Sequence, residues 1–193
     1  MSNKGQTFEA HPLEADEACR LVAAGRGVQA KAVIALLWRA GLRANELCQL
    51  RMESVRFQPD GTAKIKINRP KGVKRGAPKR VVAIDKRTVD LLRTWLAKRG
   101  EEPGPFFRTH KGKPLATSQI RRTVALAGER AQLGRRVHPH ALRHTFAAGL
   151  YREGVGMRHL QVAMGHASLG TTEKYLRDIG CDEVVEILAG REW

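Results

Sequence analysis

The chain has 193 residues, of which 35 are lysine or arginine and 19 are aspartate or glutamate, giving a formal net charge of +16. A surplus that large repels itself unless a polyanion is bound, so nucleic acid is the expected partner and an anionic membrane the second. No run approaches the roughly 18 apolar residues of a membrane span, and residues 1–12 lack the apolar core of a signal peptide. Three scattered cysteines without a CxxC pair favour free thiols in a reducing cytosol over a disulfide framework or a zinc site.

Helical periodicity dominates the first fifty residues. Residues 1–11 are polar and are expected to form a flexible arm. An amphipathic helix is predicted over 13–25, a more apolar one over 28–40, which Gly41 ends, and a third from residue 44. Arg43 stands at the break between the last two helices, and Glu46 follows three residues later. Glu46 is either an ordinary surface acid or a carboxylate that holds Arg43, and we favour the second interpretation.

The hydrophobic period changes to two over residues 53–85, with a strong turn signal at Pro59-Asp60-Gly61. This pattern predicts a small three-stranded antiparallel sheet. The stretch from its second strand into its third is basic and contains no acid; its basic residues are Lys64, Lys66, Arg69, Lys71, Lys74, Arg75, Lys79 and Arg80. A solvated loop is the ordinary interpretation of such a run. Its Gly and Pro residues and its place on a hairpin also suit insertion into a nucleic-acid groove.

Helices dominate again after the sheet. An amphipathic helix is predicted over 88–100, with Leu91, Leu92, Trp95 and Leu96 facing inward, and a loop or short strand pair over 106–115. A helix is predicted over 118–133, and three of its arginines are candidate phosphate contacts: Arg121, Arg122 and Arg130. Each of them can equally be an ordinary surface residue without a role in binding. The fold class expected is therefore α+β and mainly helical, as a single domain with the sheet on one edge.

The stretch HPHALRHTFAAGL, residues 138–150, is expected to form the helix around which the site is organised. Pro139 suits the first helical turn. One face carries His140, Arg143, His144 and Ala147, and the apolar face, expected to be buried, carries Leu142, Phe146 and Leu150. An imidazole and a guanidinium at the start of a helix suit a phosphate. Two alternatives remain: a core helix with solvated His and Arg, or a metal site of His138, His140 and His144, which lacks a nearby Cys or acid.

Further along, a helix is predicted to end at Gly165-His166, and Tyr175 follows in a Thr-rich segment. Arg43, a basic hairpin, His140-x-x-Arg143, Gly165-His166 and a late Tyr175 occur in an order that resembles the tyrosine recombinase (phage integrase) family. The resemblance covers nearly all of the chain after about residue 12. It implies a catalytic domain over 12–180 and a tail helix over 181–193, which packs on this domain or on a neighbouring protomer.

The resemblance also implies residue roles. Tyr175 is the expected nucleophile, Arg43 and Arg143 clamp the phosphate, and His140 and His166 support it. Lys71, before Gly72, best matches the lysine that acts as general acid, with Lys74 as a competitor. The DNA-contacting residues expected are Lys74, Arg75, Lys79, Arg121 and Arg122. No metal and no nucleotide cofactor is expected.

The function expected is site-specific recombination or integration of double-stranded DNA through a 3′-phosphotyrosyl intermediate, by a homotetramer on paired sites in the cytoplasm and nucleoid. Most family members carry an additional N-terminal helical domain, so we expect either a fragment or a short form similar to those that invert fimbrial switches. Two alternatives remain: a type IB topoisomerase, which shares this chemistry, and a catalytically silent DNA-binding regulator. Compactness and the short interval from His166 to Tyr175 favour the recombinase.

Overall fold

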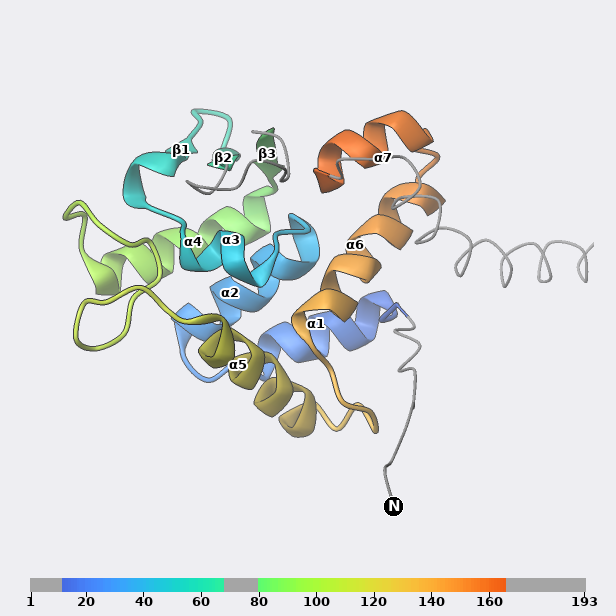
Figure 1. Cartoon of the computed structure of the whole chain (residues 1–193), viewed down its shortest axis with the longest axis horizontal. Helices are drawn as coiled ribbons and strands as arrows, with labels where there is room; N and C mark the ends of the chain where they lie inside the picture. Colours follow the sequence, from blue (N-terminus) through green and yellow to red (C-terminus); the bar gives the residue numbers. More distant parts are fainter. Residues whose placement is uncertain (1–11, 68–79, 166–193) are drawn as a thin grey trace, which may run out of the picture.

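The computed structural model of the chain describes residues 12–67 and 80–165. Within these ranges the chain forms seven α-helices, one 3₁₀ turn and three strands (Figure 1). The prediction of a mainly helical α+β fold with a small antiparallel sheet is confirmed. The expected N-terminal arm, most of the basic hairpin loop and the tail helix lie outside the described residues.

The helix at the centre of the fold is α2 (Val28–Arg39). Its residues from Ala32 to Leu37 are all buried, and a helix that is apolar on every side must be surrounded by other elements. It packs against α1 (Ala15–Ala23), α4 (Lys86–Arg99), α5 (Thr117–Arg130) and α6 (Pro139–Arg152). The short helix α3 (Ala44–Cys48) follows α2, packs against α5 and buries Leu47 in the core.

The sheet contains β1 (Val55–Phe57), β2 (Ala63–Ile67) and β3 (Arg80–Ile84), antiparallel and in that order. Alternate residues of β2 and β3 are buried, and Ile65 lies opposite Val82. Lys64 and Lys66 point outward, but Arg80 points inward and is only 6% exposed. The interpretation of the whole basic run as a surface loop is therefore wrong at Arg80, because Arg80 shares the inward register of Val82.

Several helix boundaries differ from the sequence prediction by one to three residues; α1, predicted over 13–25, spans Ala15–Ala23. Helix α4 begins at Lys86 because Asp85 caps it, its side chain accepting from the Thr88 amide at 3.0 Å. Helix α5 ends at Arg130, and Gln132 takes a left-handed φ of 52°. On α4 only Leu92 among the predicted inward residues is fully buried; the other three are half-buried.

Helix α7 (Met157–Met164) packs beside α6 and against β3 (Figure 1). It ends at Gly165, as predicted, in a left-handed conformation with a φ of 59°. The 3₁₀ turn (Met52–Ser54) and a bridge between Arg108 and Pro114 complete the connections. Among the described residues, no helix combines the length and apolar character that crossing a membrane requires.

Candidate functional site

Helix α6 begins as the sequence predicted, but its exposed and buried faces differ from the prediction. Pro139 is its first residue, and His138 caps it by accepting from the Ala141 amide at 3.2 Å. Arg143, placed by its spacing on the open face, is 2% exposed, whereas Phe146, placed on the buried face, is half-buried. The reason is that α6 packs against α2 along one side and α7 along another.

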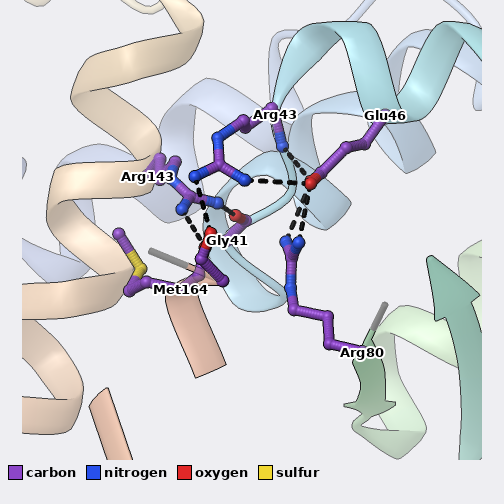
Figure 2. A network of polar contacts seen from close by, with 7 residues as sticks. Gly41, Arg43, Glu46, Arg80, Arg143 and Met164 are labelled. Carbon is purple, nitrogen blue, oxygen red and sulfur yellow. Dashed lines mark hydrogen bonds and ion pairs between the residues drawn. The ribbon is translucent and has the colours of Figure 1, made fainter. Parts of the chain in front are cut away.

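The buried Arg143 guanidinium bonds to two backbone carbonyls from distant segments. One nitrogen donates to the Gly41 carbonyl after α2, and the other donates to the Met164 carbonyl at the end of α7 (Figure 2). A buried charge requires such partners, and the carboxyl end of a helix is the favourable end for a cation. Arg143 therefore ties together the ends of two helices.

Arg43 stands immediately before α3 and contacts Glu46 twice. Its backbone amide donates to Glu46 Oε2 at 2.8 Å, and its guanidinium donates to Oε1 at 3.1 Å. The other terminal nitrogen of Arg43 donates to the Gly165 carbonyl at 3.1 Å. Glu46 thus fixes both the backbone and the side chain of Arg43 in the open turn that Gly41 begins, where Gly41 has a φ of 58°.

The structure brings Arg43 and Arg143 together although they are far apart in the chain. They donate to consecutive carbonyls, those of Gly165 and Met164 (Figure 2). His140 lies in the first turn of α6, close to both. Desolvation lowers the pKa of His140 from 6.5, and the charges of its neighbours His138, Arg143 and Arg43 lower it further. The lowered pKa favours the neutral imidazole.

Sequence reasoning missed the second partner of Glu46. Arg80 donates to both carboxylate oxygens, at 2.6 Å to Oε1 and 2.9 Å to Oε2 (Figure 2). Burial alone raises the pKa of Glu46, but hydrogen bonds and charge from Arg80, together with those from Arg43, outweigh it and hold the pKa below its ordinary 4.5. A signal was present, because alternation along β3 places Arg80 on the same face as Val82 and Ile84.

The other predicted site residues divide into two groups. Arg121, Arg122 and Arg130 are exposed on α5. The remaining candidates lie outside the described residues: Lys71, Lys74, Arg75, Lys79, His166 and Tyr175. In the described part of the chain, no group of three or more His, Cys, Asp or Glu side chains is placed to hold a metal ion. There His138 caps its helix, and the His140 and His144 rings meet edge to face, 4.4 Å between centroids.

The sequence is similar to known proteins over most of its length. Residues 12–179 match the Phage integrase family. A tyrosine recombinase of Pseudothermotoga lettingae is 35% identical over 144 residues, which are 75% of this chain and 48% of that protein. Tyrosine recombinase XerC of Thermodesulfovibrio yellowstonii is 33% identical over 154 residues, with the same two coverages. The chain spans about half the length of these curated relatives.

Solved structures show the same similarity in three dimensions. The crystal structure of XerA recombinase has a TM-score of 0.80 at 30% identity, covering 94% of this chain and 66% of that one. The XerH site-specific recombinase, in a pre-cleavage complex with its difH substrate, has a TM-score of 0.72 at 27% identity. This match covers 85% of the present chain and 50% of the XerH chain.

Proposed function

Because the chain belongs to the phage integrase family, we propose that it breaks and rejoins DNA strands in site-specific recombination, through a 3′-phosphotyrosyl intermediate. The observation that carries this proposal is the meeting of Arg43 and Arg143 at the end of α7, with His140 in the first turn of α6, one turn before Arg143. The chain runs on from the end of α7 to His166 and Tyr175. Two fixed guanidinium groups beside a neutral imidazole suit a phosphodiester whose oxygens gain charge during the reaction.

Tyr175 is the proposed nucleophile. Its phenolic oxygen forms a bond to the scissile phosphorus, and the bond from phosphorus to the 5′-oxygen breaks. The product is a 3′-phosphotyrosyl link and a free 5′-hydroxyl. A phenol with a pKa near 10 is mostly protonated at neutral pH, so it requires a proton acceptor and nearby positive charge. His140 is suited to accept the phenolic proton because its lowered pKa favours the neutral imidazole, which has a nitrogen lone pair available.

The arginines act on the non-bridging oxygens. Arg43 donates one N–H to Glu46 and another to the Gly165 carbonyl, and a guanidinium has five N–H groups, so it has donors for a phosphate as well. Arg143 approaches from α6, and His166 is proposed to hold the same phosphate from another side. Lys71 is the proposed general acid that protonates the leaving 5′-oxygen, with Lys74 as the alternative donor.

The proposed partner is double-stranded DNA, bound largely through phosphate contacts. The formal net charge of +16 supplies the attraction. Arg121 and Arg122 are exposed on α5, and we assign them to the DNA surface together with Lys74, Arg75 and Lys79. Because the phosphotyrosyl bond conserves the energy of the broken one, a second DNA end can attack it, and a homotetramer on two paired duplexes is the assembly that strand exchange requires.

The decisive experiment traps the covalent intermediate on a nicked duplex, from which the short cleaved strand diffuses away and prevents rejoining. The wild-type chain is expected to give a covalent protein–DNA adduct, and Tyr175→Phe to give none while retaining DNA affinity. No adduct from wild type on any duplex tested would refute the enzyme assignment and favour the silent DNA-binding regulator. Relaxation of supercoiled plasmid without exchange between two sites would favour the topoisomerase instead.

A further inference from the structure

Arg80 is a buried arginine committed to one carboxylate. Its side chain is 3% exposed, and its two terminal nitrogens grip the two oxygens of Glu46 as a fork. Its Nε has no hydrogen-bond partner among the described residues. Burying a guanidinium on the inner face of a sheet is costly, so this arginine requires an explanation beyond hairpin stability.

Glu46 is shared between two guanidinium groups. Oε1 accepts from Arg43 at 3.1 Å and from Arg80 at 2.6 Å. Oε2 accepts from the Arg43 amide at 2.8 Å and from Arg80 at 2.9 Å. The closer side-chain contacts go to Arg80, so the negative charge of Glu46 is balanced mainly from β3. One positive charge of the cluster remains, and it lies on the more exposed Arg43.

We propose that Arg80 is a positioning residue for DNA cleavage, acting through Glu46 to keep Arg43 ordered and its positive charge directed toward the scissile phosphate. This inference rests on the proposed function. Without Arg80, the half-buried carboxylate has Arg43 as its remaining guanidinium partner among these contacts. Attraction between charges is strong in a medium of low dielectric constant, so Arg43 becomes an exclusive ion pair with Glu46 and is drawn away from the substrate.

A third contact extends the effect of Arg80 to the end of α7. A Cβ atom on Gly165 would lie 2.7 Å from Arg80 Nη1 and 3.1 Å from its Cδ and Cζ, and Gly165 has a φ of 59°. Glycine therefore lets α7 end directly against Arg80. Since the Gly165 carbonyl also accepts from Arg43, the side chains of Arg80 and Arg43 both lie against the residue that precedes His166.

The test compares Arg80→Met, Arg80→Lys, Glu46→Gln and the double variant Arg80→Met/Glu46→Gln. Adduct formation on the nicked duplex is measured in single turnover at saturating protein, and DNA affinity is measured separately. Arg80→Met is expected to slow cleavage roughly 10- to 100-fold while changing affinity less than about threefold. The double variant is expected to cleave faster than Arg80→Met, because the carboxylate that captures Arg43 is gone. Arg80→Lys keeps the charge without the fork and is expected to lie between wild type and Arg80→Met.

The matched control is Arg99→Lys, at another buried arginine, whose guanidinium donates to the Pro105, Gly100 and Glu102 carbonyls. Arg99→Lys is expected to lower the free energy of unfolding, but not to slow cleavage while leaving DNA affinity nearly unchanged, which is the effect expected of Arg80→Met. The proposal is overturned if folded Arg80→Met cleaves at the wild-type rate, or if the double variant is no faster than Arg80→Met. Should Arg80→Met not fold, Arg80→Lys decides, and a wild-type rate from that variant overturns the proposal.

A second measurement is independent of cleavage and so separates failure of this inference from failure of the proposed function. Phenylglyoxal modifies accessible guanidinium groups, and the modification of Arg43 is followed by peptide mapping. Arg80→Met is expected to slow modification of Arg43, and the added Glu46→Gln to restore it. Faster or unchanged modification of Arg43 in Arg80→Met refutes the inference, even in a chain that forms no DNA adduct.

Discussion

Replacing Gly41 with alanine tests the turn on which the candidate site is built. Gly41 has a φ of 58°, and a Cβ atom there would lie 2.7 Å from Phe146 Cε1 and 3.0 Å from its Cγ. Non-bonded carbons prefer separations of about 3.5–4.0 Å. The left-handed conformation costs alanine about 1–2 kcal/mol, and overpacking against the ring adds about 1–3 kcal/mol. Gly41→Ala is therefore expected to lower the free energy of unfolding by about 2–5 kcal/mol.

Gly134→Ala is the matched control, because Gly134 has a φ of 66° and a Cβ atom there would meet nothing within 4 Å. Gly134→Ala is expected to lower the free energy of unfolding only by the cost of the left-handed conformation, about 1–2 kcal/mol. Urea denaturation followed by circular dichroism measures the free energy of unfolding of both variants. Adding Phe146→Leu to Gly41→Ala should recover part of the stability that Gly41→Ala loses, because the smaller side chain relieves the overpacking. Equal losses at the two glycines would refute the reasoning. Since the Gly41 carbonyl accepts from Arg143, the variant should also cleave DNA more slowly at equal folded concentration.

Three further predictions concern charge and capping. Glu46→Gln should lower the free energy of unfolding at neutral pH. The folded-state pKa of Glu46 lies below its ordinary 4.5, so the extra stability of the wild-type protein over Glu46→Gln is fully present above pH 4.5 and is lost as the pH falls through the folded-state pKa. A gap in the free energy of unfolding that does not narrow in acid would contradict this. Asp85→Ala removes the cap of α4 and should cost about 1 kcal/mol, or about 2–4 °C in melting temperature, and an unchanged melting curve would exclude that role for Asp85. DNA affinity should fall steeply with salt because bound counterions are released; a flat response between low and moderate salt would argue against phosphate-dominated binding.

The backbone around the candidate site was predictable because its determinants are local. Apolar residues at helical spacing located α2, alternation located the three strands, and the turn before Arg43 followed from Gly41. The end of α7 at Gly165 was equally predictable, since a left-handed residue that closes a helix is usually glycine. Each of these signals lies within a few residues of the feature that it predicts.

The surroundings of the two buried arginines were decided by tertiary structure alone. Spacing placed Arg143 on an open face, yet its partners are carbonyls contributed by the ends of α2 and α7. Composition placed Arg80 in a surface run, yet it is buried on Glu46. Helical and strand periods specify which residues share a face of one element, but not which other element covers that face. The sequence by itself therefore determined the elements and the types of the site residues. Only the packing of β3, α6 and α7 against the end of α2 decided which of the cations are buried and paired.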